Sequence, residues 1–139
     1  MLYKEIIDYL SSVSAITDIL STYAGAPAIF QKKAPEKANM PYVTILIAGR
    51  KHVDSTINYG DLILDYWDFN KSQVKANEFD MELENALDSI RITGGVRLSD
   101  IRFDLSSSGH VEDSDSRDIH FNAIYGFRGI RKKWMEDTQ

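Results

Sequence analysis

The sequence predicts an α+β fold, in which a mainly antiparallel β-sheet of about four strands carries helices packed on one face. Apolar residues recur at helical spacing near the N-terminus and again across residues 73–90. Other segments alternate apolar and polar residues, which is the pattern of half-buried strands. Because the strands outnumber the helices that could connect them in parallel, antiparallel pairing is the simplest arrangement.

The N-terminal part of the chain predicts two helices, a short strand and a loop. Apolar residues three and four positions apart predict a helix over residues 2–10 and a second, shorter helix over Ser14–Tyr23. The first residue of the second helix is a suitable N-cap, and Gly25 would end that helix. Residues 28–31 are a candidate strand, and the polar segment 32–40 predicts an exposed loop.

The central part of the chain predicts two strands. Residues 41–49 begin with proline and are rich in β-branched residues, so we expect a strand buried on both faces or nearly so. Residues 49–61 form a polar connection whose ends are compatible with strand. Residues 62–67 alternate, so one face of the second strand would carry two leucines and Tyr66, and the other would carry Trp67.

Residues 73–90 predict an acidic amphipathic helix. Its apolar stripe has members at spacings of three or four: Ala76, Phe79, Leu83, Leu87 and Ile90. Its glutamates mostly face away from this stripe. The run Thr93-Gly94-Gly95 is expected to stop the helix.

The C-terminal part predicts an antiparallel hairpin. Residues 101–105 alternate, and residues 119–127 alternate over the clearest strand in the sequence. The polar segment 106–117 between them is expected to be a long loop. The predicted core consists of apolar members of the periodic segments: Ile45, Ile47, Leu64, Phe79, Leu83, Leu87, Phe103, Phe121, Ala123 and Tyr125.

Length and composition indicate one domain over residues 1–139, with residues 131–139 as a flexible charged tail. No cysteine is present, so the chain has neither a disulfide framework nor a thiolate nucleophile. The N-terminus carries two acids in its first ten residues, which does not fit a secretory signal peptide. The net charge of −5 argues against a general nucleic-acid binder.

The sequence holds no catalytic set, so we expect neither an enzyme nor a cofactor site. It has no GxSxG elbow, and its paired glycines lack the lysine and the spacing of a phosphate loop. The three histidines, His52, His110 and His120, are expected in surface or turn positions. Trp67 and Phe69 resemble a stacking platform for bases, but aromatic residues alternating on a strand favour a core role.

The best metal candidate is the loop between His110 and His120. Asp113, Asp115 and Asp118 are hard oxygen ligands of the kind that Ca²⁺ prefers. The turn glycine and distal glutamate of a helix–loop–helix calcium site are missing. We therefore expect a solvated loop with no metal, and no rise in melting temperature when Ca²⁺ or Mg²⁺ is added.

Charge is segregated along the chain, which favours contacts between copies, although a charged run is commonly only a solvated face. The paired carboxylates of the acidic helix likewise fit a solvated outer face better than acid–base chemistry. The candidate contact residues are Lys32, Lys33, Lys37, Glu78, Glu82, Glu84, Arg128, Arg131 and Lys132.

The order of these segments resembles the tail terminator (tail completion) proteins of long-tailed bacteriophages and prophages. Three strings carry the resemblance, and it covers most of the chain. Ala34-Pro35 precedes Met40-Pro41-Tyr42-Val43-Thr44, Leu64-Asp65-Tyr66-Trp67 precedes the helix over Ala76 to Leu87, and Arg117-Asp118-Ile119-His120-Phe121 opens the last strand.

The resemblance implies a structural virion assembly protein. It implies a homo-oligomeric ring, usually a hexamer, that caps the tail tube, ends its polymerisation and provides the surface that joins tail to head. The implied partners are further copies of the chain, the tail tube protein and the head connector protein. Genomic DNA would pass through without specific binding, and the place would be the head-proximal end of the tail, assembled in the host cytoplasm. Two alternatives remain: another head–tail connector component, or a stand-alone protein-binding module.

Overall fold

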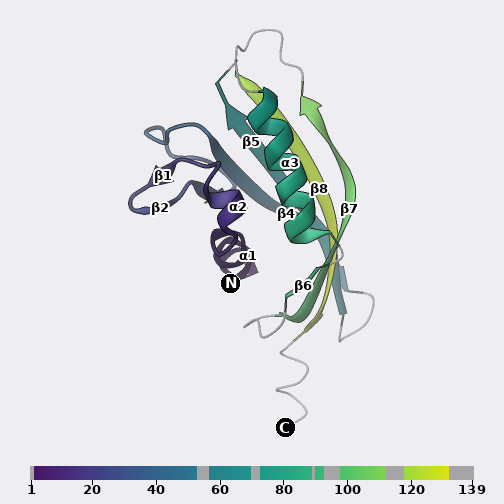
Figure 1. Cartoon of the computed structure of the whole chain (residues 1–139). Helices are drawn as coiled ribbons and strands as arrows, with labels where there is room; N and C mark the ends of the chain where they lie inside the picture. Colours follow the sequence, from purple (N-terminus) through teal and green to yellow (C-terminus); the bar gives the residue numbers. More distant parts are fainter. Residues whose placement is uncertain are drawn as a thin grey trace.

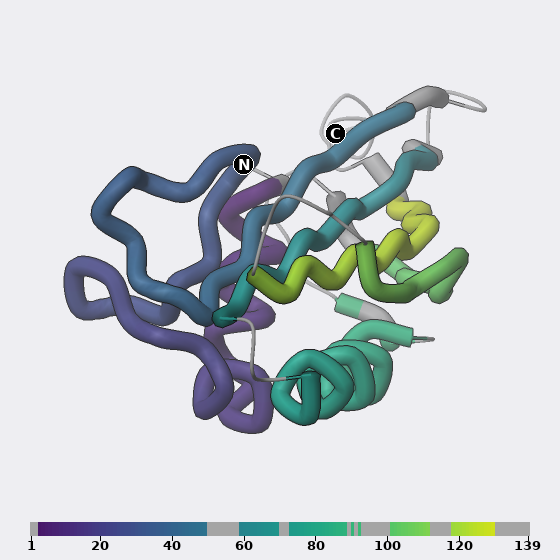
Figure 2. The backbone as a smooth tube through the Cα atoms, turned by 90° about the horizontal axis from the view of Figure 1, so that it is seen from above, coloured from purple at the N-terminus to yellow at the C-terminus, as the bar shows by residue number. Residues whose placement is uncertain are grey.

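The computed structural model describes residues 2–52, 57–69, 73–88, 90–92, 98–111 and 118–131. Over these residues the chain forms a six-stranded sheet with helices on one face and a separate two-stranded hairpin at one side (Figures 1 and 2). The predicted α+β class is confirmed.

The elements follow one another in the order α1 (Leu2–Ser11), α2 (Ser14–Thr17), β1 (Thr22–Tyr23), β2 (Ala26–Pro27), β3 (Ile29–Gln31), β4 (Tyr42–His52), β5 (Ile57–Asp68), α3 (Gln73–Leu87), β6 (Arg91–Ile92), β7 (Leu98–Val111) and β8 (Ile119–Arg131). The strand order in the large sheet is β3-β4-β5-β8-β7-β6. Only β3 and β4 are parallel among these described pairs. The four long strands therefore form an antiparallel centre, as predicted, and two short strands border it.

The register of β5 and β8 places the buried side chains of both strands on the same face. Leu64 is opposite Ala123, and Tyr66 is opposite Phe121. All four are buried, and the residues that alternate with them in β5 are partly or fully exposed. The alternation predicted for residues 62–67 is confirmed.

The helices cover this buried face. Figure 2 shows α1 and α3 on the same side of the sheet. The predicted stripe of α3 is buried from Ala76 to Leu87, and the ring of Phe79 stacks on that of Tyr66 with centroids 4.6 Å apart. Ile90, predicted as the last member of the stripe, lies beyond the end of the helix and is half-buried.

The predicted core is largely confirmed. Every residue proposed for it is buried except Ile47, which is half-buried and packs against the core. The prediction that β4 is buried on both faces is wrong. Leu46 is 39% exposed, because the helices pack on only one face of the sheet.

The segment after α1 differs from the prediction. The second helix ends at Thr17 rather than at residue 23, and its N-cap position is Val13, with no side-chain capping bond. Residues 22–27 instead form a tight hairpin, β1 with β2. Ala24 and Gly25 make its turn with φ of 50° and 81°, a region that glycine adopts at least cost. The glycine therefore marks a hairpin and not the end of a helix.

Strands also extend into segments predicted as polar connections. β7 includes residues 106–111, which were expected to be loop, and β4 and β5 extend to His52 and from Ile57. Strand pairing uses backbone groups, so a long neighbour such as β8 can hold polar residues in strand conformation. β8 itself continues to Arg131, the first residue of the predicted tail. Three predictions fall on residues outside the described part of the chain: the helix stop at residues 93–95, the rest of the loop at residues 112–117, and the rest of the tail at residues 132–139.

Candidate assembly surfaces

The basic loop, residues 32–37, lies at the β3 side of the sheet. Lys32, Lys33 and Lys37 are exposed, and they form no ion pair with any residue that the structure describes. The start of the loop is fixed, because the backbone N–H of Lys32 donates to the carbonyl of Ile45 at 2.8 Å. The structure thus confirms an exposed loop and brings its lysines into one short segment.

The acidic residues of α3 lie on two different flanks of the helix. Successive residues of an α-helix turn by about 100°, so Glu84 lies near Asp80 on one flank, while Glu78 and Glu82 lie on the other. Glu78 and Glu84 are exposed, and Glu82 is half-buried. The three glutamates were predicted together as candidate contacts, but the turn of the helix places them on two different flanks.

The flank with Glu84 faces β7. Next to it along the helix, Asn77 Oδ1 lies 3.2 Å from His110 Nε2 of β7. At the helix end, Asp88 Oδ1 accepts a hydrogen bond from the backbone N–H of Leu105 at 2.8 Å. We call Asp80, Glu84 and Asp88 the acidic flank.

The basic loop and the acidic flank occupy opposite edges of the molecule. The strand order puts β3 at one edge of the sheet and β7 with the short β6 at the other. Figure 1 shows the segment after β3 on the left of the sheet and α3 with β7 on the right.

The C-terminal basic residues do not join the basic loop. Arg128 is exposed on β8, which lies in the centre of the sheet. Arg131 is the last residue of β8, and Lys132 lies outside the described residues. The two basic groups predicted as one kind of contact therefore belong to different surfaces.

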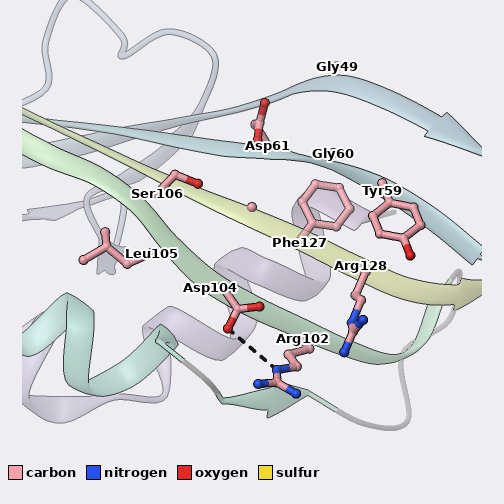
Figure 3. Close-up of a pocket in the computed structure, with 11 residues that line it drawn as sticks. Gly49, Tyr59, Gly60, Asp61, Arg102, Asp104, Leu105, Ser106, Phe127 and Arg128 are labelled. Carbon is pink, nitrogen blue, oxygen red and sulfur yellow. Dashed lines mark ion pairs between the residues drawn. The ribbon is translucent and has the colours of Figure 1, made fainter.

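An open pocket of about 500 Å³ lies on the sheet around Arg128 (Figure 3). Its charged lining comes from three strands: Asp61 of β5, Arg102 and Asp104 of β7, and Arg128 of β8. These residues alternate with buried neighbours, so their side chains lie on the face that the helices leave open. We call this feature the sheet pocket.

Part of the lining of the sheet pocket is backbone without side chains. Gly49, Gly60 and Gly126 contribute to its lining from three strands. A Cβ atom on Gly60 would lie 2.8 Å from the ring of Phe127, so this position accommodates the ring only as glycine. Sequence reasoning missed the pocket, although glycines inside strand segments often mark close approaches of this kind.

The charges in the sheet pocket suit a polar or charged group of a partner. Arg102 and Arg128 are cross-strand partners, which places like charges opposite each other. Arg102 Nε lies 3.7 Å from Asp104 Oδ1, a long ion pair (Figure 3). Arg128 makes no ion pair with a described residue and is available to a carboxylate.

A second cluster on the open face surrounds His120. Its Nε2 lies 2.6 Å from Asp65 Oδ1, and Asn122 Nδ2 donates to the same oxygen at 2.9 Å. Its ring stacks on Trp67 with centroids 3.7 Å apart. This histidine was predicted in a surface or turn position, but it lies half-buried within a strand. Trp67 is also only half-buried and Phe69 is 63% exposed, so the predicted core role of these aromatics is wrong.

The strings that carried the family resemblance meet at this cluster. Trp67 ends one string and His120 belongs to another, and the two residues are paired across β5 and β8. Cross-strand register is not readable from one strand alone, so the sequence did not reveal the contact.

The predicted metal candidates are only partly within the described residues. Asp118 is half-buried. The pKa of Tyr42 is raised, first by the burial of that tyrosine and then by the negative charge of Asp118. Asp113 and Asp115 lie outside the described residues. In the part of the chain that the structure describes, no group of acidic or histidine side chains is arranged to hold a metal ion. In the same part, no helix is long and apolar enough to span a bilayer.

Comparison with known proteins gives likenesses of structure rather than of sequence. No protein-family model matches the chain, and no curated protein matches it. A chain of the virion of a native gene transfer agent (GTA) particle superposes with a TM-score of 0.65 at 12% identity, covering 88% of this chain and 90% of that one. A second solved chain, of no stated function, gives a TM-score of 0.55 at 11% identity and covers 91% and 95%. At these identities the protein shares its fold, nearly end to end, with a chain found in a gene transfer agent virion.

Proposed function

We propose that the protein is a structural component of a phage-like virion and that it acts as a tail terminator. In this role a ring of copies, a hexamer, caps the tail tube, ends its polymerisation and presents a surface to the head connector. The observation that carries the proposal is the fold likeness to a virion chain over almost the full length of both chains. The ordered strings around Pro41, Trp67 and His120 support the finer assignment by resemblance.

The distribution of charge is compatible with a ring. A subunit in a ring offers one surface to a different surface of its neighbour. Here the basic loop and the acidic flank lie at opposite edges. Exposed ion pairs contribute only about 0–1 kcal/mol each, so apolar contacts must supply most of the affinity. Charge then sets the register and the salt sensitivity of the contact.

The role requires no chemistry of the chain. A capping ring acts by occupying the tube end, so we propose a protein without catalytic activity, cofactor or metal. Its partners would be further copies of itself, the tail tube and the head connector. With a net charge of −5 the ring would let DNA pass without holding it.

The proposal is tested by mixing the protein with purified tail tubes of its own phage. We expect capped tubes or ring-shaped particles in negative-stain images, and co-sedimentation of the protein with tubes. Reversal of two charges in the basic loop, Lys32→Glu with Lys33→Glu, should weaken capping, and raised salt should do the same.

A matched control carries the same change of charge elsewhere. Lys4 on α1 and Lys75 on α3 are both exposed, so Lys4→Glu with Lys75→Glu should leave capping near the unmodified level. A protein that ignores tubes and stays monomeric at every concentration would contradict the proposal. Binding to isolated head connectors but not to tubes would indicate another head–tail joining component instead.

One observation favours a second candidate, a stand-alone module that binds a peptide by edge-strand addition. No described strand lies beside residues 106–111 of β7 on the side away from β8. An open strand edge of this kind can accept an extended segment from another chain. Failure on tubes together with capture of extended peptides would favour this function.

A further inference from the structure

The outer edge of β7 changes from covered to open near Leu105. Before that point β6 pairs with Ile101 and Arg102, and a bridge joins Asp88 to Phe103. The carboxylate of Asp88 then accepts a hydrogen bond from the backbone N–H of Leu105. Beyond it, residues 106–111 are all exposed, and no described strand pairs with them on this side. An edge of this kind presents unpaired backbone donors and acceptors.

The acidic flank of α3 runs along the same edge. The contacts of Asn77 with His110 and of Asp88 with Leu105 fix the two ends of the helix against β7. Asp80 and Glu84 lie between these two ends on the same flank, and Figure 1 shows α3 running beside β7. The open strand edge and the acidic side chains therefore form one surface.

A buried hydroxyl lies beneath this surface. Tyr125 has 0% of its surface exposed, and its hydroxyl oxygen has no hydrogen-bond partner among the residues that the structure describes. Burial raises the pKa of this tyrosine, and the nearby carboxylates of Asp80, Glu84 and Asp88 raise it further. A buried polar atom without a partner costs about 1–3 kcal/mol. Tyr125 is thus a buried phenol near three carboxylates, and none of these carboxylates forms an ion pair with a residue that the structure describes.

We infer that this surface, the acidic flank with the open edge of β7, receives the basic loop of a second copy of the chain. The inference rests on the proposed ring and names the contact that would close it. The occupant is an ammonium group and not a metal ion, because the described acidic side chains form no metal-holding group.

Charge and position both select the basic loop as the occupant. Its lysines are exposed, make no ion pair with a described residue, and sit at the opposite edge of the sheet. A contact between opposite edges repeats from copy to copy, which is the condition for a ring. Arg128 is also basic and exposed, but it lies in the central strand β8 and is less able to reach a neighbour's edge.

The absence of cysteine makes the contact testable by disulfide trapping. Two single variants, Glu84→Cys and Lys33→Cys, are mixed on tail tubes and oxidised. We expect linked dimers in the mixture and little linkage in either variant alone, because the contact joins two different surfaces.

The matched control uses the other flank of the same helix. Glu78→Cys is also exposed, but it faces away from β7. Since a disulfide needs Cα atoms within about 7 Å, we expect roughly tenfold less linkage of Glu78→Cys with Lys33→Cys than of Glu84→Cys with Lys33→Cys.

A charge exchange gives a second measurement. Glu84→Lys and Lys33→Glu should each reduce capping of tubes, and the two changes in one chain should restore it, because the pair is then complementary again. Both positions are exposed, so thermal melting should show that each variant folds.

The outcomes separate the inference from the proposed function. If tubes are capped but the Glu78→Cys mixture links as well as the Glu84→Cys mixture, or if the charge exchange restores nothing, the inference is wrong and the ring stands. If no variant and no unmodified protein caps a tube, the proposed function fails and the inference fails with it.

Discussion

At the scale of single residues, two buried tyrosines differ in one hydrogen bond. The hydroxyl of Tyr66 donates to Asp68 Oδ2 at 2.9 Å, and the buried Asp68 also accepts the backbone N–H of Phe69 at 2.7 Å. The hydroxyl of Tyr125 has no hydrogen-bond partner in the described part of the chain. The same side chain therefore contributes differently at two positions of one core.

Replacing each tyrosine with phenylalanine should expose this difference. Tyr125→Phe removes an unpaired buried hydroxyl, so we expect the free energy of unfolding to rise by about 1 kcal/mol. Tyr66→Phe removes a hydrogen bond to a carboxylate and should lower it by about 1.5–3 kcal/mol. Urea denaturation of both variants measures the two changes. If Tyr125→Phe lost as much stability as Tyr66→Phe, the hydroxyl of Tyr125 would have to form a hydrogen bond in the fold.

Leu83 tests the packing of α3 on the sheet. Its side chain is 0% exposed within the apolar stripe, so Leu83→Ala should cost about 2–5 kcal/mol in the free energy of unfolding. Met81, two residues earlier, is 53% exposed, and Met81→Ala should change stability by less than about 0.5 kcal/mol. An unchanged denaturation midpoint for Leu83→Ala would mean that the stripe does not face the core.

At the scale of elements, the join between β5 and β8 depends on a missing side chain. Gly60 is opposite Phe127, and a Cβ there would lie 2.8 Å from the aromatic ring. Gly60→Ala should therefore destabilise the protein by about 1–3 kcal/mol, because the ring must leave its position. In Gly126→Ala the new Cβ would have its nearest neighbour at 3.7 Å, an ordinary contact. Thermal melting should show a clear loss for the first variant and a much smaller change for the second.

Elements with a strong period were predictable, and elements held by their neighbours were not. α3 and β8 show a clear apolar stripe and a clear alternation, and both were located from the sequence. Residues 106–111 are serines, glycine, histidine and valine with no apolar alternation, yet they are strand because β8 pairs with them. The β1–β2 hairpin was missed because a glycine after a short apolar segment fits a helix end as well as a turn.

Only the charged residues of the candidate surfaces could be predicted from the sequence, and not the way in which those residues meet. The exposure of the lysines in the basic loop was predictable, because a polar segment with proline predicts a loop. The sheet pocket depends on Arg102, Arg128 and Asp61 meeting from three strands, and the acidic flank depends on which side of α3 faces β7. Both require cross-strand register and helix orientation, which one sequence does not determine.

At the scale of the whole molecule, the fold separates its core and its candidate surfaces by face. The helix-covered face holds the core, the open face holds the sheet pocket and the His120 cluster, and the two edges carry opposite charge. A monomer has no evident need for edges of opposite charge. In the ring that we propose, each subunit would use one edge for each of its two neighbours and would keep the open face for other partners.

The stability of the whole protein should fall in alkali because of its buried tyrosines. The pKa of Tyr66 is raised above its ordinary value of 10.0 by burial first, and then by the hydrogen bond to Asp68 and nearby negative charge. The pKa of Tyr125 is raised by burial and by three carboxylates. Above pH 10 the unfolded chain therefore releases protons that the folded chain retains, so the stabilisation is complete below pH 10 and is lost as pH rises.

Each tyrosine that stays protonated in the fold should contribute a loss of about 1.4 kcal/mol per pH unit above that point. The contribution of these two tyrosines to the denaturation midpoint should be constant near pH 8–9 and should fall steadily above pH 10. The double variant Tyr66→Phe with Tyr125→Phe should lose stability less steeply with pH, whatever its stability at neutral pH. Guanidinium titrations from pH 8 to pH 11 compare the two slopes directly. Equal slopes would mean that these hydroxyls ionise as readily in the fold as in the unfolded chain, and that the buried face of the sheet admits water near them.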